Sequence, residues 1–268
     1  MSPRPTAAFF DLDKTIIATS SALAFGREFM HNGLVTRAEA MHFSLVKASY
    51  LVSGQTSEQM DTTRDQLTAL VAGWDVDEVQ RITTEAMHSV VTPVIYAEAR
   101  DLIRQHREAG RDVVIVSASV THLVHPIAAE LGIAPEDVIA SELEVEQGRF
   151  TGEVLAYLKG PAKAEAMRAM AERRGYDMAG SYAYSDSATD VPMLEQVGNP
   201  VAVNPDRALK KAALERGWTI RSFKDPVPLV TLPTARDIGI GAGVLAGLAA
   251  VTAGSIWIAQ RGRNSSAS

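Results

Sequence analysis

Short apolar runs alternate with stretches of helical spacing over most of the chain. A run such as Val113–Val116 is typical of a buried strand, whereas the stretches between the runs have apolar residues three and four apart. Strands that alternate with helices predict a doubly wound, mostly parallel α/β sheet. We expect strands at Ala7–Phe10, Val113–Val116, Val138–Ala140, Tyr182–Tyr184, Pro200–Val203 and Trp218–Phe223, and helices at Tyr96–Ala109, Thr121–Leu131, Ala162–Arg174, Val191–Val197 and Asp206–Arg216.

Two segments depart from this alternation. From a helix-start signal at Ser20-Ser21 up to about Thr92, apolar residues recur only at helical spacing. We expect residues 18–92 to form a helical cap inserted into a core of residues 1–17 and 93–225, because one crossover connection needs only a single helix. Further on, the glycine turn at Gln147-Gly148 predicts a hairpin of Leu143–Val145 with Arg149–Thr151.

The carboxyl-terminal part of the chain has a third pattern. Ile238 to Ala259 contains no charged residue and would form about 33 Å of helix, close to the roughly 30 Å of bilayer hydrocarbon. We expect a transmembrane helix at 238–259, between a proline-containing linker at 226–237 and a short polar tail at 260–268. The alternative is a buried helix rich in alanine and glycine. Gly239, Gly243 and Gly247 lie four apart, a spacing that lets membrane helices pack closely, so a homodimer through them is a further hypothesis.

Composition narrows the class of protein. With 46% hydrophobic and 22% charged residues, the chain is globular in type. Its net charge of -6 argues against a nucleic-acid partner, for which a basic patch would be expected. The absence of cysteine excludes disulfides, thiolate nucleophiles and cysteine-bound zinc. No apolar segment of signal-peptide type follows the polar leader, so we expect the core in the cytoplasm, held at the membrane by the carboxyl-terminal helix.

Two aspartates follow the first predicted strand at once. Asp11 and Asp13 are separated by one residue, and on an extended chain such side chains point the same way. They would stand where open α/β sheets bind their ligands, at the carboxyl end of a parallel strand. Because like charges repel, a divalent cation such as Mg²⁺ would stabilise the pair.

Polar residues recur at the other boundaries that a parallel sheet would bring to the same edge. Ser117 follows the strand Val113–Val116 directly, and Asp186 and Asp190 follow Tyr182–Tyr184. Lys163 lies in the first turn of its predicted helix. Each has a simpler explanation, since Ser117 and Asp190 could cap helices and Lys163 could be an exposed lysine. Their order and placement together favour a single site.

In this arrangement the chain resembles the haloacid dehalogenase-like (HAD) hydrolases, subfamily IB, which includes phosphoserine phosphatase. Asp11-Leu12-Asp13-Lys14-Thr15 matches the family's D-x-D-x-T motif, and the resemblance covers about residues 6–223. It implies that Asp11 is the nucleophile and Asp13 the general acid and base. It also implies phosphate binding by Ser117 and Lys163, and a Mg²⁺ cofactor held by Asp11, the backbone carbonyl of Asp13 and Asp186, with support from Asp190.

The resemblance leaves the substrate open. Phosphoserine phosphatases have an acidic residue at the position of Ser20 here, where it holds the ammonium group of the substrate. Glycines usually follow the serine of the second motif, where this chain has Ala118-Ser119. Three hypotheses follow: a phosphatase for phosphoserine or another small phosphomonoester, the same chemistry on a membrane lipid phosphate such as lysophosphatidate, or a non-catalytic phosphate-binding scaffold.

Overall fold

The computed structural model describes residues 4–36, 68 and 70–224, and the structural statements below concern those residues. The chain divides into two units, Met1–Val227 and Pro228–Ser268, and the second lies wholly outside the described residues. The predicted transmembrane helix at 238–259, its linker, its tail and its row of glycines therefore also lie outside them. Within the described ranges, no helix is both long enough and apolar enough to cross a membrane. The membrane helix thus stays a prediction.

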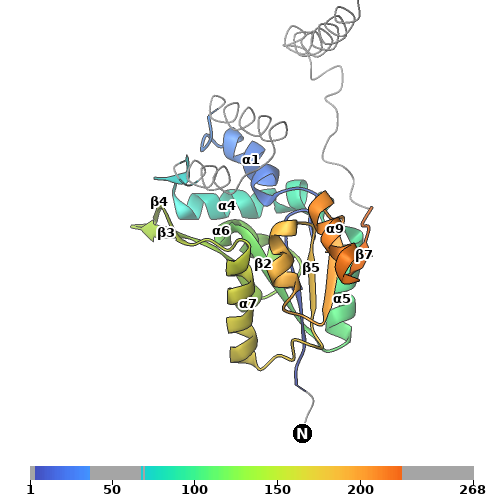
Figure 1. Cartoon of the computed structure of the whole chain (residues 1–268). Helices are drawn as coiled ribbons and strands as arrows, with labels where there is room; N and C mark the ends of the chain where they lie inside the picture. Colours follow the sequence, from blue (N-terminus) through green and yellow to red (C-terminus); the bar gives the residue numbers. More distant parts are fainter. Residues whose placement is uncertain (1–3, 37–67, 69, 225–268) are drawn as a thin grey trace, which may run out of the picture. The chain divides into compact units, whose positions relative to one another are not determined.

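A seven-stranded sheet forms the centre of the first unit (Figure 1). Its strands are β1 (Ala7–Phe10), β2 (Asp112–Val120), β3 (Val138–Glu146), β4 (Arg149–Ala156), β5 (Tyr182–Ser185), β6 (Asn199–Val203) and β7 (Thr219–Arg221). They are ordered β4-β3-β2-β1-β5-β6-β7, and all neighbours are parallel except β3 and β4. Because β1 stands in the middle and later strands extend to either side, the predicted doubly wound, mostly parallel sheet is confirmed.

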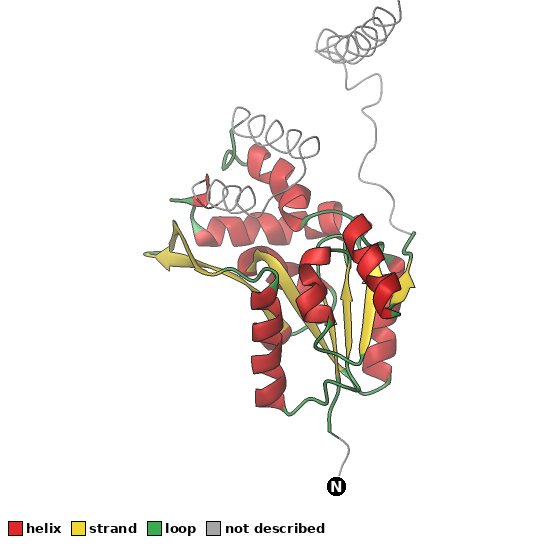
Figure 2. Cartoon of the chain, viewed as in Figure 1, coloured by secondary structure: helices red, strands yellow, loops and turns green. Residues whose placement is uncertain are grey.

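Helices cover both faces of this sheet (Figure 2). They are α5 (Ala97–Glu108), α6 (Thr121–Glu130), α7 (Pro161–Arg174), α8 (Val191–Leu194) and α9 (Arg207–Arg216). Ala8 and Phe10 of β1 pack in one apolar cluster with residues of α5 and α6, whereas Ala7 and Phe9 pack in another with residues of α7, α8 and α9. Burial on both faces explains why β1 is a continuous apolar run in the sequence rather than an alternating one.

The strands nearest the hairpin extend further than expected. β2 continues past Val116 to Val120, and β3 is one strand where two short ones were predicted. The pairing of β2 with β3 shifts between Ser117 and Val120, so two residues of β2 have no partner in the ladder. The predicted turn is confirmed, with positive φ at Gln147 and Gly148, as two-residue hairpin turns require.

The described part of the predicted cap is helical. It contains α1 (Ser21–His31), α4 (Val76–Ala86), a π-helical turn (Met87–Val91) and a 3-10 turn (Thr92–Val94), whereas 37–67 and 69 lie outside the described residues. Ser20 caps α1 as expected, accepting a hydrogen bond from the Leu23 N–H. Backbone hydrogen bonds join Gly73 and Trp74 to Phe150, so this segment is attached to the β3–β4 hairpin. The limits of the cap stay a prediction.

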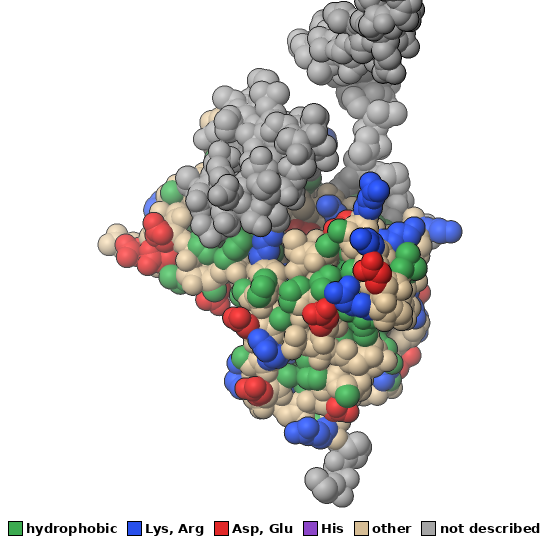
Figure 3. Space-filling view, in the orientation of Figure 1, with side chains coloured by type: hydrophobic (Ala, Val, Ile, Leu, Met, Phe, Trp, Pro, Cys, Tyr) green, Lys and Arg blue, Asp and Glu red, His purple; other side chains and the backbone are tan. Residues whose placement is uncertain are grey.

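The face of the molecule seen in Figure 3 has a mixed surface. Acidic and basic side chains are interspersed over its described residues, with hydrophobic side chains between them. This mixture and the net charge of -6 agree with the expectation that nucleic acid is not a partner, which stays a prediction.

Candidate active site

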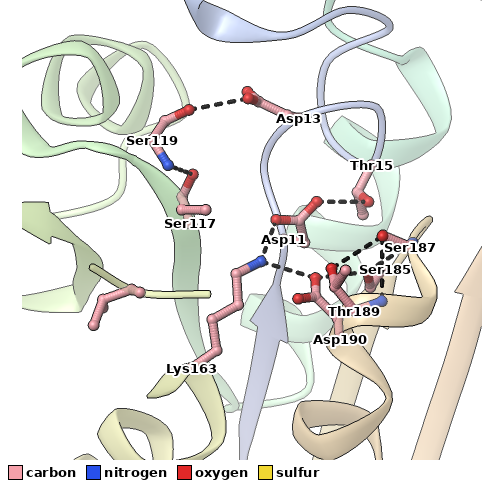
Figure 4. Close-up of polar contacts among 12 residues, drawn as sticks. Asp11, Asp13, Thr15, Ser117, Ser119, Lys163, Ser185, Ser187, Thr189 and Asp190 are labelled. Atoms are coloured by element: carbon pink, nitrogen blue, oxygen red, sulfur yellow. Dashed lines mark hydrogen bonds and ion pairs between the residues drawn. The ribbon is translucent and has the colours of Figure 1, made fainter. Parts of the chain in front are cut away.

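The predicted site residues gather at the carboxyl ends of three neighbouring strands (Figure 4). Asp11 directly follows β1, Ser117 lies in the distal part of β2, and Asp186 directly follows β5. The Asp11 N–H donates to the Tyr184 carbonyl at 2.9 Å, which holds Asp11 in line with β1 and beside β5. The expected convergence of separate sequence segments on one edge of the sheet is therefore confirmed.

Lys163 lies in the first turn of α7 and is buried, with only 3% of its surface exposed. Its Nζ donates to Asp11 Oδ1 at 2.6 Å and to Asp190 Oδ2 at 2.8 Å. Burial alone would lower the pKa of Lys163, but the two carboxylates outweigh burial and hold that pKa above its ordinary value. Lys163 is therefore a permanently charged ammonium group inside the site and not an exposed surface lysine.

Hydroxyl groups also donate hydrogen bonds to Asp11 and Asp190, the two carboxylates that Lys163 contacts. The Thr15 hydroxyl donates to Asp11 Oδ2 at 3.1 Å, and the Ser185 hydroxyl donates to Asp190 Oδ2 at 2.8 Å. Asp11 and Asp190 are 6% and 2% exposed, so few waters can reach them. Their orientation is fixed by these contacts within the protein.

The site contains more negative than positive charge. Burial raises the pKa of Asp11 to about 7; Lys163 opposes this shift, whereas Asp190 and Asp13 add to it. Burial also raises the pKa of Asp186 to about 6, with Lys14 opposing and Asp190 adding. Asp190 thus affects both groups, which places Asp186 in the same electrostatic environment as Asp11. An additional cation would stabilise all of these carboxylates in their ionised form.

Asp13 faces a different set of donors. The Ser21 N–H, at the start of α1, donates to Asp13 Oδ1 at 2.9 Å, and the Ser119 hydroxyl donates to Asp13 Oδ2 at 3.0 Å. Burial raises the pKa of Asp13, although these hydrogen bonds act in the opposite direction. Asp13 is therefore held between β2 and the first helix of the cap segment.

The predicted metal ligands can be compared with this geometry. Within the described residues, no three or more Asp, Glu, His or Cys side chains are arranged together as a ready metal site. The predicted set requires only two carboxylate side chains, from Asp11 and Asp186, because Asp13 would use its backbone carbonyl. The finding therefore leaves that set a prediction.

Several polar residues of the site are not evident from the sequence. Thr15 belongs to the quoted D-x-D-x-T motif, and Ser185 adjoins Asp186, but the hydrogen bond of either to a carboxylate needs the folded structure. Ser119 was noted only as a departure from the glycine of related chains. Its spacing two residues after Ser117, on one strand, was the available signal.

Comparison with known proteins agrees with the architecture and the motifs. The model of the HAD family, described as haloacid dehalogenase-like hydrolase, matches residues 8–195. A Mycobacterium tuberculosis protein named as a probable phosphatase is 48% identical over 94% of this chain and 87% of its own. Phosphoserine phosphatase SerB1 of the same organism is 34% identical, over 91% of this chain and 80% of its own.

A solved structure shares the fold. The phospho-aspartyl intermediate analogue of phosphoserine phosphatase has a TM-score of 0.58 and 20% identity, and the match covers 84% of this chain and 95% of that one. The family match spans most of the chain and includes the residues that converge at the edge of the sheet. A phosphatase-named relative at 48% identity also leaves the scaffold hypothesis without support. The chain therefore belongs to the haloacid dehalogenase-like hydrolase family, as a phosphatase that resembles phosphoserine phosphatase.

Proposed function

We propose that this phosphatase hydrolyses phosphomonoesters in two steps through an aspartyl-phosphate at Asp11, and that its substrate is a small soluble ester such as phosphoserine. The proposal rests above all on the buried contact between Lys163 Nζ and Asp11 Oδ1, at 2.6 Å. Lys163 there fixes the orientation of a carboxylate and adds positive charge where a phosphoryl group would arrive. Asp13 follows two residues later on the same loop and is held by donors of its own.

In the first step, a carboxylate oxygen of Asp11 attacks phosphorus, and the bond from phosphorus to the ester oxygen breaks. Asp13 donates its proton to that oxygen, so the product leaves as a neutral alcohol. In the second step, the Asp13 carboxylate takes a proton from water, whose oxygen attacks the phosphorus. The bond to Asp11 then breaks, phosphate leaves, and both aspartates regain their starting protonation.

Ser117 is suited to hold a phosphate oxygen during both steps. It is 1% exposed, and its Oγ accepts a hydrogen bond from the Ser119 N–H at 3.1 Å. That bond occupies a lone pair and not the proton, so the Ser117 hydroxyl can still donate. A negatively charged oxygen at the end of β2 would receive it.

The residues of the site fit Mg²⁺. Asp11 and Asp190 contact the ammonium of Lys163, Lys14 acts on Asp186, and burial raises the pKa of both Asp11 and Asp186. Oxygen donors in excess of positive charge are what a hard divalent cation requires. Asp11, Asp186 and the Asp13 carbonyl would hold the ion, with Asp190 as a supporting residue. When bound, Mg²⁺ would neutralise charge on the phosphoryl oxygens.

Phosphate release from an aryl phosphate tests this proposal. The full-length protein should release phosphate with Mg²⁺ and lose activity with a chelator, and Asp11→Asn should abolish turnover. Asp101→Asn is the matched control, because Asp101 is exposed on α5 and pairs only with Arg104 in the described residues. Acid quenching should trap a phosphoryl group on the peptide that contains Asp11. Full activity of Asp11→Asn would refute the assignment.

A lipid phosphate is the second candidate substrate. Ser20 caps α1, so the position that is acidic in phosphoserine phosphatases carries a hydroxyl committed to the helix. The uncharged segment Ile238 to Ala259 would bring the enzyme to a membrane surface. Rates on phosphoserine and on lysophosphatidate in detergent discriminate between the two substrates, and membrane sedimentation of the full-length protein tests the anchor. A protein that stays in the supernatant would remove the support for a membrane substrate.

A further inference from the structure

Near Asp13, two residues of β2 have no partner in the ladder with β3. Ser117 pairs with Ala140, and Val120 pairs with the next residue of β3, Ser141. Ala118 and Ser119 therefore form an irregularity of the kind that redirects a side chain near a functional site. Figure 4 shows the result, with Ser119 between Ser117 and Asp13 and bonded to both.

The hydrogen bonds around Ser119 have one consistent direction. Ser119 Oγ lies 3.0 Å from Asp13 Oδ2 and 2.7 Å from Ser21 Oγ, whereas Ser21 Oγ lies 3.4 Å from Asp13 Oδ2. Each hydroxyl has one proton to donate, and Asp13 Oδ2 can accept a hydrogen bond whether the group is ionised or carries its proton on the other oxygen. The shorter contacts are satisfied together when Ser21 donates to Ser119 and Ser119 donates to Asp13. The direct contact between Ser21 and Asp13 is the weakest of the three.

We infer that Ser119 is a positioning residue that aims the Asp13 carboxyl at the leaving oxygen of the substrate, an inference that rests on the proposed function. The Ser21 N–H fixes one oxygen of Asp13, and the Ser119 hydroxyl fixes the other. With both oxygens held, rotation of the carboxyl group about its last bond is prevented. General acid catalysis depends on that geometry, because the acid must lie within hydrogen-bond reach of the atom that it protonates.

The hydrogen bonds from Ser21 and Ser119 also connect Asp13 to the cap segment. Ser21 is the first residue of α1 and is fully buried, and both its N–H and its hydroxyl belong to the set of groups around Asp13. Ser119, in β2, belongs to the core. The orientation of the acid therefore depends on groups from both segments at once.

Leaving-group dependence tests the inference. A good leaving group such as p-nitrophenolate departs without a proton, whereas an alkoxide such as that of β-glycerophosphate needs one. We expect Ser119→Ala to lower kcat/KM for the alkyl ester about 10- to 100-fold, a part of the typical contribution of a general acid, and for the aryl ester less than about 3-fold. The parameter kcat/KM excludes later hydrolysis of the aspartyl-phosphate, so it reports the step that Asp13 assists.

Three further variants make the result specific. Ser119→Thr keeps the hydroxyl and should restore the alkyl rate. In an Asp13→Asn background, Ser119→Ala should no longer lower the remaining alkyl rate, because a residue that acts through the acid of Asp13 has no acid left to position. Ser89→Ala is the matched control, since among the described residues its hydroxyl bonds only its own helical turn, at Ala86, and it should behave as wild type.

The outcomes distinguish failure of the role of Ser119 from failure of the proposed function. Equal losses on both esters, an unchanged alkyl rate, or failure of Ser119→Thr to restore it would each overturn the role of Ser119 and leave the proposed function intact. A wild-type protein that releases no phosphate from either ester would overturn the proposed function and this inference with it.

Discussion

Acid should destabilise the folded protein through His106, a residue remote from the site in sequence. His106 is 4% exposed between α5 and the sheet. Its Nδ1 accepts a hydrogen bond from Arg111 Nε at 2.8 Å, and its Nε2 lies 2.7 Å from the Tyr184 hydroxyl. Because the guanidinium can only donate, Nδ1 must be unprotonated, and the neutral ring carries its proton on Nε2. Protonation at Nδ1 would place two donors face to face.

The size of the effect follows from the shift in pKa. Burial lowers the pKa of His106 from 6.5 to about 4, with Arg111 and Arg221 acting in the same direction. The unfolded chain therefore binds a proton that the folded chain excludes, and folding stability falls as the pH decreases from 6.5 to 4. The shift predicts a loss of about 2 kcal/mol by pH 5 and about 3 kcal/mol near pH 4.

Urea unfolding between pH 7.5 and pH 4.5 measures this loss. His106→Gln keeps a polar side chain at the position and removes the titration, so its stability should be lower at pH 7.5 but should decline less steeply with acid. His88→Gln is the control, because the His88 side chain is 86% exposed. The reasoning would be refuted if the free energy of unfolding fell equally with pH in wild type and His106→Gln. An NMR titration of His106 near pH 6.5 in the folded protein would refute it as well.

Two further predictions concern the buried charges and one close backbone approach. Lys163→Met should leave the buried carboxylates of Asp11 and Asp190 without their cation. The variant should lose about 100-fold or more in kcat/KM and about 3–5 kcal/mol in the free energy of unfolding. Unchanged urea unfolding would contradict this prediction. A Cβ at Gly198 would overlap the Ala179 carbonyl oxygen, so Gly198→Ala should cost about 3 kcal/mol. Gly26→Ala, with no described atom within 4 Å, should be neutral or stabilising by about 1 kcal/mol, and equal melting shifts in the two variants would disprove this contrast.

The pattern of apolar residues predicted the fold well because, in the central strands, the residue types of each segment match the burial that the sheet imposes. Ala7–Phe10 is apolar at every position, as a strand buried on both faces must be, and parallel pairing then determines which edge receives Asp11. The length of β2 was underestimated at Val116, because Ser117-Ala118-Ser119 has the composition of a loop. Pairing with β3 keeps Ser117 in the sheet, and that contact is not visible in the local sequence.

The inner contacts of the site could not be predicted for a similar reason. Nothing near Lys163 in the sequence shows that it is buried, since its partners Asp11 and Asp190 come from other elements. Ser119 meets Ser21 across 98 positions, through a hydroxyl contact that no spacing rule describes. Residue types and strand ends therefore indicated where the chemistry lies, whereas the partners of each group depend on tertiary packing.

The central position of β1 has a consequence for biosynthesis. Ala7 stands beside Asp112 on one side, and Ala8 stands beside Tyr182 on the other. β1 must therefore wait for partners that are synthesised much later, and contacts between such distant residues form slowly. A nascent chain that ends before Asp190 still lacks one of the two carboxylates paired with Lys163. The groups around Asp11 should therefore be complete only when synthesis of the described residues is nearly finished.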